Sequence, residues 1–320
     1  MKRNRRSILV GATAVAAAVG IAFAIVPAFA AARGGDGGHA REGGGVTYLL
    51  ASLRGANEVP VAGKPAVGDP DGAALEFVRI KGATVTFAVK WRGTGRPTML
   101  HIHQGVRGVN GDVKVDFSEQ LGSVRGGGGW QRAAGSVTVK DTALLASLKR
   151  DPGAFYANLH TAEFPGGAVR GQLREVGSFD LSQAVDGGVR QASVVRGRQV
   201  YECKKGADGT TAFAQRDVAA VLDGGIRHTF TAPHSGTPQW LAPDASAVTG
   251  KVLTKSPNGD GNIPELDLKA TRSGARHGLL AGADEVLRLN TVGGVAPVGA
   301  CSTGAVVGVP YRADYVFIDR

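Results

Sequence analysis

The residues best suited to chemistry are two histidines in the stretch Met99–Gly105, which alternates apolar residues with histidine before it ends in glycine. On a β-strand successive side chains point to opposite faces, so His101 and His103 share one face, while Leu100 and Ile102 share the other. Two imidazoles placed in this way are half of a metal site. They serve equally well as structural histidines that hydrogen-bond to neighbouring loops, and the sequence leaves both interpretations open.

A third histidine, His160, ends a strand expected over residues 155–160, and it shares a face with Asn158. If this strand lies beside the first, three neutral imidazoles meet on one face, a ligand set that suits a single zinc or copper ion. Residues 46–176 hold only these three histidines, so a binuclear site like that of Cu/Zn superoxide dismutase is excluded. We expect a metal to require ring nitrogens within about 4 Å of one another. Rings that point apart, or that backbone partners fully occupy, would contradict it.

Charged side chains near these histidines have two interpretations. Glu58 is a candidate for orienting the histidine cluster, or Glu58 and Asn57 satisfy backbone groups of the turn expected over residues 55–60. Arg170 is expected to pair with Glu58 or with Glu163 as a structural ion pair.

The strand pattern predicts an all-β protein of two sandwich-like domains, over residues 46–176 and 178–319. The chain has 49 glycines, and short Val-, Thr- and Phe-rich runs alternate with turn residues. One short helix is expected in the first domain, over residues 142–151, with Asp141 or Thr142 as its cap.

The N-terminal segment is predicted to be a targeting signal. A basic start, an apolar run over residues 8–26 and the cleavage motif Ala28–Ala30 indicate a cleaved signal peptide over residues 1–30. The pair Arg5-Arg6 also fits twin-arginine export, and a Sec signal fits equally well. Residues 31–45 are predicted to form a Gly-rich linker. The protein is therefore expected to be secreted or associated with the cell envelope, and to meet a membrane only during export.

The charge pattern bears on partners. The formal net charge is +10, and the signal segment carries four of the basic residues, which leaves 10 − 4 = +6 after cleavage. No block of like charges remains, so we do not expect nucleic acid as a partner. We expect instead an unidentified partner in the cell envelope or outside the cell.

The two cysteines, Cys203 and Cys301, are both in the second domain. In an exported protein an even number of cysteines predicts a disulfide, and closing so long a loop stabilises a fold by ~4–5 kcal/mol in chain-entropy models. A metal role for the pair is the alternative, but no CxxC spacing supports it.

A family resemblance rests on motifs that occur in order through the first domain. They are Leu53-x-Gly55-x-Asn57-Glu58-Val59-Pro60, His101-Ile102-His103-x-Gly105, Tyr156-x-Asn158-Leu159-His160-Thr161, Phe164-Pro165-Gly166-Gly167 and Arg170-Gly171-Gln172-Leu173. With these motifs the domain resembles the CHRD (chordin) domain. The resemblance implies a β-sandwich extracellular module, which binds growth factors in animal chordin, occurs in many exported bacterial proteins, and has no established activity.

The second domain resembles a secreted family of unknown function found in bacteria and fungi. The motifs that carry this resemblance are Val200-Tyr201-x-Cys203, His234-x-Gly236-x-Pro238-x-Trp240, Asn290-Thr291-x-Gly293-Gly294-x-Ala296-Pro297 and Pro310-Tyr311-x-Ala313-Asp314-Tyr315. The loop with His234 and Trp240 is expected either to contact a small ligand or to be structural.

Catalysis is the weakest of the functional hypotheses. His228, His234 and Asp314 are the candidates for an acid/base set in the second domain, but no hydrolase or metalloprotease motif supports one. The leading hypothesis is a non-catalytic extracellular or cell-envelope binding module. The alternative is a mononuclear copper or zinc protein with its site at His101, His103 and His160.

Overall fold

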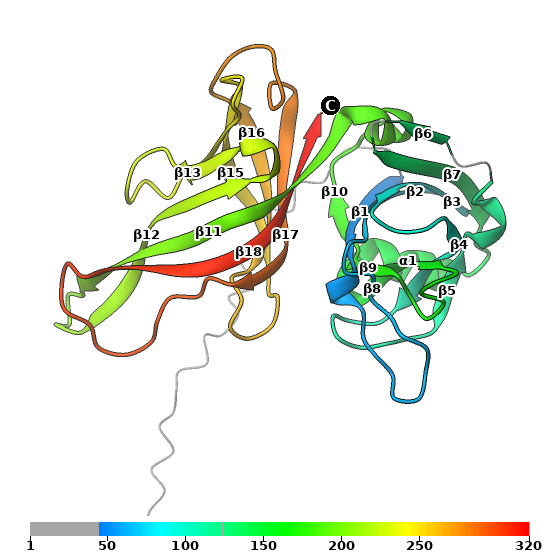
Figure 1. Ribbon diagram of the computed structural model, residues 1–320, viewed down its shortest axis with the longest axis horizontal. Coiled ribbons are helices and arrows are strands. Elements are labelled where there is room, and N and C mark those ends of the chain that lie inside the picture. The colour runs from blue at the N-terminus through cyan, green and yellow to red at the C-terminus, as the bar shows by residue number, and fades with distance from the viewer. Residues whose placement is uncertain (1–44, 123–124, 128, 320) are drawn as a thin grey trace, which may run out of the picture. The chain divides into compact units, whose positions relative to one another are not determined.

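Two antiparallel β-sheets account for most of the computed structural model, and each is described by itself (Figure 1). The structure describes residues 45–122, 125–127 and 129–319. The predicted signal peptide and nearly all of the predicted linker lie outside these residues. Within the described part of the chain, no helix is both long enough and apolar enough to cross a membrane.

The first sheet has the strand order β5-β4-β8-β9-β1-β2-β3-β7-β6, and β10 pairs with β1. Every pair in it is antiparallel, and consecutive strands such as β2 and β3 form hairpins. Its strands are β1 Val46–Arg54, β2 Ala73–Lys81, β3 Thr84–Arg92, β4 Pro97–Gln104, β5 Val113–Asp116, β6 Arg125–Gly127, β7 Trp130–Thr138, β8 Phe155–Thr161, β9 Val169–Gln172 and β10 Arg174–Val176.

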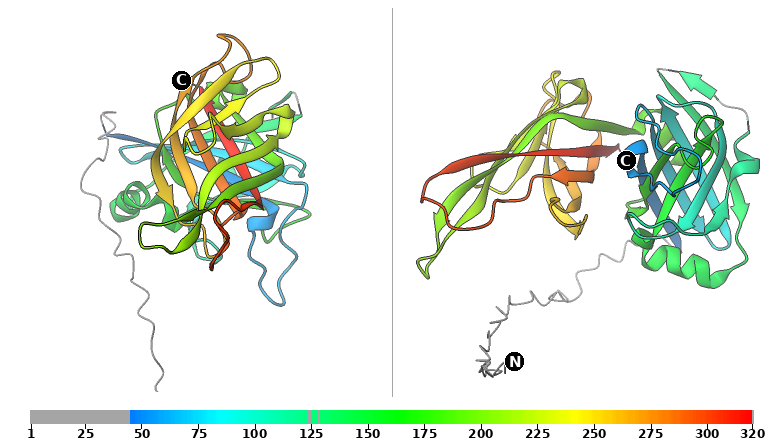
Figure 2. Two further views of the ribbon diagram at one scale, coloured as in Figure 1. Left: turned by 90° about the vertical axis from the view of Figure 1, so that its left-hand side faces the viewer. Right: turned by 60° about the horizontal axis from the view of Figure 1, so that its bottom comes forward.

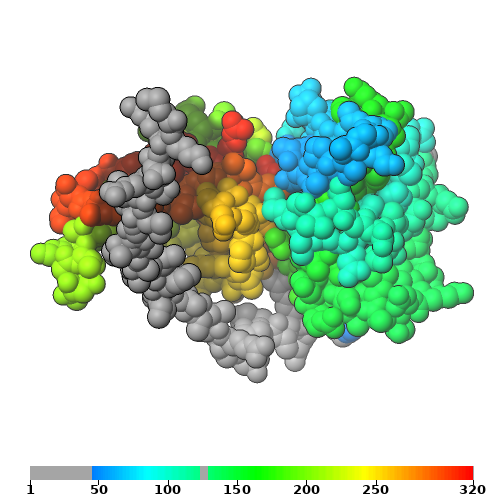
Figure 3. All heavy atoms as spheres, turned by 90° about the horizontal axis from the view of Figure 1, so that it is seen from below, coloured from blue at the N-terminus to red at the C-terminus, as the bar shows by residue number. Residues whose placement is uncertain are grey.

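One face of this sheet encloses an apolar core. Leu100 and Ile102 of β4, with Ala157 and Leu159 of β8, are completely buried in it. The alternation predicted for residues 99–103 is confirmed, since the histidines occupy the opposite face. The long loop between β1 and β2, drawn in blue in Figure 3, is exposed around Val61.

The predicted helix is present as α1, Thr142–Arg150. Asp141 is its N-cap, and the Asp141 side chain accepts a hydrogen bond of 2.9 Å from the Leu144 amide. Leu145 and Leu148 project from the helix into the core. The helix lies at one end of the first sheet (Figure 2). Short helical turns complete the described elements: η1 Gly55–Asn57, η2 Ser118–Gln120, η3 Pro152–Ala154, α2 Leu181–Gln183, η4 Ala184–Gly188 and η5 Asp223–Gly225.

The second sheet is a closed barrel, where the sequence led us to expect a sandwich. Each strand from β11 to β18 pairs with the next in the chain, and β18 pairs back onto β11. The first and last strands are long enough to close the sheet, and both carry irregular registers that help it to curl. The strands are β11 Val189–Lys205, β12 Thr211–Leu222, β13 Arg227–Phe230, β14 Pro238–Leu241, β15 Ala247–Ser256, β16 Glu265–Arg272, β17 Ala283–Gly293 and β18 Val306–Asp319.

The predicted disulfide between Cys203 and Cys301 is confirmed. Cys203 is in β11 and is completely buried, whereas Cys301 lies in the connection between β17 and β18. The bond joins residues 98 positions apart and ties this connection to the barrel wall.

Candidate functional site

Two neighbouring strands bring the three histidines together. In the β4–β8 pair, His101 lies opposite Asn158 and His103 lies opposite Tyr156, while His160 lies opposite Met99. His101, His103 and His160 therefore share the face that points away from the apolar core. The pairing of the two strands, which the sequence left conditional, is present in the structure.

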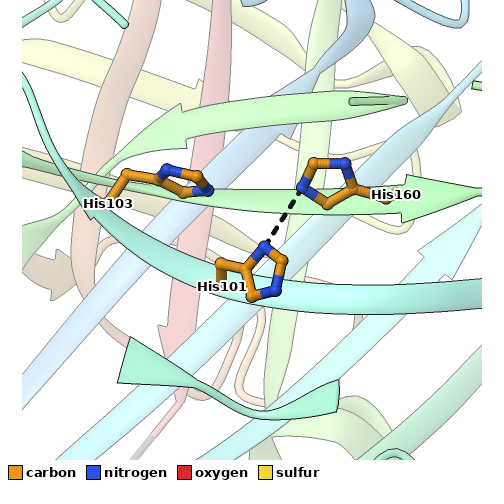
Figure 4. Close-up of side chains that lie close together, drawn as sticks. All are labelled: His101, His103 and His160. Atoms are coloured by element: carbon orange, nitrogen blue, oxygen red, sulfur yellow. Dashed lines mark hydrogen bonds between the residues drawn. The ribbon is translucent and has the colours of Figure 1, made fainter. Parts of the chain in front are cut away.

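The rings of this cluster turn toward one another (Figure 4). His101 Nδ1 lies 3.3 Å from His160 Nε2. One nitrogen from each of the three rings can be chosen so that all lie within 4.8 Å of one another. The ring centroids of His103 and His160 are the farthest apart at 6.4 Å, against 5.1 Å for His101 and His160. The three side chains are at most 9% exposed.

The nitrogen of each ring that faces away from the cluster has its own partner. His103 Nδ1 lies 2.9 Å from the Gly111 carbonyl oxygen, and His160 Nδ1 lies 3.0 Å from the Pro165 carbonyl oxygen. Because a carbonyl only accepts, each of these Nδ1 atoms carries a proton, and each Nε2 presents a lone pair. His103 Nε2 is buried and has no hydrogen-bond partner among the described residues.

The two ring nitrogens of His101 exchange these roles: its outward nitrogen is Nε2, and its inward nitrogen is Nδ1. Its Nε2 lies 3.4 Å from Asp116 Oδ1 and 3.3 Å from Ser118 Oγ. When Nε2–H donates to the Asp116 carboxylate, the lone pair of His101 is on Nδ1, which faces His160. All three rings then direct lone pairs into the same space, as metal-binding histidines held by outer hydrogen bonds do.

The electrostatics of the cluster keep the rings neutral. Burial and the nearby ring of His160 together lower the pKa of His101 to about 4, against the opposing effect of Asp116. Burial likewise lowers the pKa of His103 and of His160, against the opposing effect of their carbonyl partners. Neutral imidazole is the form that binds a metal ion. At neutral pH the inward nitrogens are already unprotonated, so a metal ion does not have to displace a proton from them.

The distances fit a metal ion after a small movement. Zinc or copper bonds of ~2.0–2.1 Å place the nitrogens of a tetrahedral site ~3.4 Å apart. The 3.3 Å between His101 and His160 already matches this value. The three nitrogens lie within 4.8 Å of one another, which is wider than the separation of about 4 Å that we expected for a metal site. Since the His103 ring is farthest from His160, it is the ring that would move inward, by up to about 1.4 Å, the difference between 4.8 and 3.4 Å.

The loop that anchors His103 is itself fixed by Arg170, which is only 1% exposed. The Arg170 guanidinium donates to the carbonyl oxygens of Val106 and Val109, at 3.2 and 2.7 Å, and to Asn110 Oδ1 at 2.9 Å. It also lies 3.4 Å from the centre of the Tyr156 ring. Neither Glu58 nor Glu163, its expected partners, lies within ion-pair distance of it. Arg170 therefore positions the loop that ends at the Gly111 carbonyl.

Glu58 lies beside this loop, and the pKa of its carboxyl group is raised. Burial raises its pKa to about 8, although the nearby Arg170 charge and the Asn158 amide both lower it. Glu58 Oε1 and Asn158 Oδ1 are buried without hydrogen-bond partners in the described part of the chain. Asn57, its neighbour, donates to the Arg170 carbonyl at 3.0 Å, as expected of a residue that satisfies backbone groups.

The candidate residues of the second domain are not brought together. His228 Nδ1 lies 2.9 Å from the Gln239 carbonyl oxygen inside the barrel, and His234 Nε2 lies 2.8 Å from Glu202 at the surface. Asp314 accepts from Ser193 at 2.7 Å. Each of the three has a separate partner, so no acid/base set forms from them.

The two residues predicted to share a ligand-binding loop, His234 and Trp240, lie in different elements of the structure. His234 remains in a loop, with a positive φ of 65°. Trp240, which we placed in the same loop, is instead in β14, where it is 1% exposed and stacks on His228 at 4.6 Å between ring centres.

The outer partners of the histidines were missed from sequence. Asp116 ends β5 and Ser118 begins η2, but nothing in their spacing connects them to His101. The Gly111 and Pro165 contributions are backbone carbonyls, which no pattern of side chains reveals.

Comparison with known families covers nearly all of the described chain. Residues 49–173 match the family model of the CHRD domain, and residues 186–319 match that of a protein of unknown function, DUF3455. Comparison with curated proteins and with solved structures found no match.

Proposed function

The chain combines a CHRD domain at residues 49–173 with a DUF3455 domain at residues 186–319, and on that premise we propose that it is an exported, non-catalytic binding protein whose CHRD domain holds one zinc or copper ion. The ligands are His101 Nδ1, His103 Nε2 and His160 Nε2. All three come from the paired strands β4 and β8, so the backbone fixes their spacing.

One observation carries this proposal: every ring is anchored through one nitrogen and presents the other to the same space. The Gly111 and Pro165 carbonyls fix the tautomers of His103 and His160. In a purely structural cluster His101 Nδ1 and His160 Nε2, which lie 3.3 Å apart, would serve as hydrogen-bond partners for each other, and we would expect the third inward nitrogen to have a partner too. His103 Nε2 has none among the described residues, and burying an unpaired polar atom costs about 1–3 kcal/mol. A bound cation would offset this cost.

The ligand set selects the class of ion. Three imidazoles suit zinc and copper better than calcium or magnesium, which prefer oxygen ligands. With three protein ligands the ion keeps an open position for water or for a group on a partner. Ser118 Oγ lies 3.3 Å from His101 Nε2, but in the proposed site this nitrogen carries the proton that it donates to Asp116 and is no base for the hydroxyl, so we propose binding rather than catalysis.

The proposal of export rests on two features. The basic start, apolar run and cleavage motif of residues 1–30 are typical of a signal peptide. The Cys203–Cys301 disulfide is typical of an oxidising compartment. Mass spectrometry of the protein recovered from the envelope or medium tests this directly. A mature chain that begins at Ala31 is expected, and an intact N-terminus on protein retained in the cytoplasm would contradict it.

The metal proposal is tested by titrating the untagged protein, stripped with chelator, with Zn²⁺ and with Cu²⁺ in a calorimeter. We expect one saturable site per chain and a rise in Tm on binding. The His101→Ala/His103→Ala double variant should lose both, and the single variant His103→Gln should weaken binding while remaining folded.

The matched control is His234→Ala, which removes an exposed histidine far from β4 in sequence. It should bind metal as the parent does. If it loses binding to the same extent as the double variant, or if the parent shows no saturable site, the proposed function is wrong.

A further inference from the structure

The interior of the β11–β18 barrel contains a cavity of about 340 Å³. Closed barrels of eight antiparallel strands have interiors wide enough to hold one small ligand, and cavities of ~300–1,000 Å³ are the usual size of small-molecule sites. The residues that line this cavity come from all eight strands of the barrel and from three loop positions, Gly236, Ile263 and Pro264.

The walls are mostly apolar and aromatic. Aliphatic residues and prolines of β12 and β14–β16 cover one part of the lining, and rings cover the rest. Trp240 stacks on His228 with 4° between the ring planes, and Tyr315 meets Trp240 edge-on at 5.5 Å. Burial lowers the pKa of His228 to about 3, so this imidazole is neutral and adds no charge to the cavity at neutral pH. Such walls suit a flat apolar group.

The polar groups of the cavity are donors. Gln199 Nε2 and Trp240 Nε1 are buried without partners among the described residues, and both side chains are 1% exposed. The Gln199 oxygen already accepts a hydrogen bond of 2.7 Å from Gln215, so the free part of the Gln199 amide is its N–H₂ group. Two buried donors that lack acceptors are an independent sign that a ligand supplies one.

Arg288 provides the charge. Its Nε and Nη2 donate to the Pro264 carbonyl oxygen at 3.1 and 2.8 Å, which fixes the guanidinium against the wall of the cavity, where it also interacts with the Tyr315 hydroxyl. No carboxylate in the described part of the chain lies within ion-pair distance of Arg288. The residues that line the cavity include no Asp or Glu, and a second cation, Lys255, lies exposed among them.

We propose that this barrel binds a small, ring-bearing apolar molecule with one anionic group. The ring would occupy the aromatic walls, and the anion would accept from Arg288, Gln199 and Trp240. This site is separate from the histidine cluster and does not depend on a metal there.

Two fluorescent probes that differ by one sulfonate test the proposal: N-phenyl-1-naphthylamine and 1-anilinonaphthalene-8-sulfonate. Titrated into the full mature chain, each should bind at one saturable site, and the sulfonate should bind more tightly by on the order of tenfold. Absence of saturable binding of the sulfonate, or several weak sites per chain, would overturn the proposal.

Variants distinguish the cavity from the surface. Arg288→Gln should abolish the preference for the sulfonate and leave the neutral probe bound, whereas Lys251→Gln, which removes an exposed cation of β15, should change neither. Val252→Trp should block the cavity from its half-exposed position and weaken both probes. If Arg288→Gln fails to fold, Val252→Trp decides alone, and unchanged binding in a folded Val252→Trp protein would overturn the proposal.

Discussion

His101 Nδ1 lies 3.3 Å from His160 Nε2, across two strands whose registers are fixed by the apolar core on their other face. This separation is the edge length of a tetrahedral zinc or copper site. The two histidines are 59 residues apart in the chain, so their approach depends on the pairing of β4 with β8.

The partner of His101 should matter for metal affinity although it is not a ligand. Asp116 is 60% exposed and lies 3.4 Å from His101 Nε2, where it favours the tautomer with its lone pair on Nδ1. Asp116→Ala should therefore weaken metal binding by ~10–100-fold, the usual cost of losing such a partner. Competition with a chelator of known affinity measures this, and Glu119→Ala, which removes an exposed carboxylate of η2, is the control. Equal affinity in parent and Asp116→Ala would contradict this role.

Arg170 should affect the site through the loop that it holds. Arg170→Lys retains the charge but cannot make the planar set of hydrogen bonds to Val106, Val109 and Asn110. The Gly111 carbonyl would then fix His103 less firmly, so metal affinity should fall by about tenfold or more while all three ligands remain. Chelator competition measures the affinity. A variant with lowered Tm but unchanged affinity would show that Arg170 is only structural.

Glu76 should make the stability of the protein depend on pH. It is completely buried, its carboxylate oxygens have no partners in the described part of the chain, and burial raises its pKa to about 8. The folded state therefore keeps the proton that the unfolded state loses above its ordinary pKa of 4.5. Glu76 therefore does not reduce the free energy of unfolding below pH 4.5. Above it, ionisation of Glu76 in the unfolded state lowers that free energy by about 1.4 kcal/mol per pH unit as the pH rises toward 8.

Glu76→Gln should remove this loss because the amide cannot ionise. Urea unfolding of the chelator-treated protein at pH 5, about 6.5 and about 8 measures the free energy of unfolding, and the variant should gain on the parent as the pH rises. Glu58, whose pKa is also raised to about 8, loses its proton in the same window, so Glu58→Gln is a matched variant with its own partial effect. Parallel curves for Glu76→Gln and the parent would contradict the assignment.

The disulfide should stabilise the second domain selectively. Cys203 and Cys301 close a loop of 98 residues, for which chain-entropy models give ~4–5 kcal/mol. Cys203→Ser/Cys301→Ser should lower the unfolding temperature of the second domain and leave metal binding by the first domain intact. Calorimetry and chelator competition follow the two effects separately. A double variant as stable as the parent would show that the bond adds little.

The sequence predicts the histidine face well because a strand has only two faces. Once residues 99–103 are taken as a strand, Leu100 and Ile102 must enter the core, and His101 and His103 must face away from it. His160 follows if its strand is the neighbour, which the local pattern cannot show because pairing of distant strands depends on the whole sheet.

The closure of the second domain is less accessible to sequence. Alternation identifies the strand that ends near Ile318, but its partner begins at Val189, more than a hundred residues earlier, and nothing local joins them. Trp240 was misplaced because its strand β14 has only four residues, flanked by turn residues that resemble a loop. The barrel cavity depends on this closure and was therefore missed as well.

The central claim is tested most directly by the metal content of the mature protein, purified from its own export route without chelator or histidine tag. Parent and His101→Ala/His103→Ala protein should be compared by elemental analysis. We predict about one zinc or copper ion per parent chain, and none above background in a folded variant. A parent without metal, beside a variant that is merely less stable, would show that the three histidines only hold the sheet to its loops.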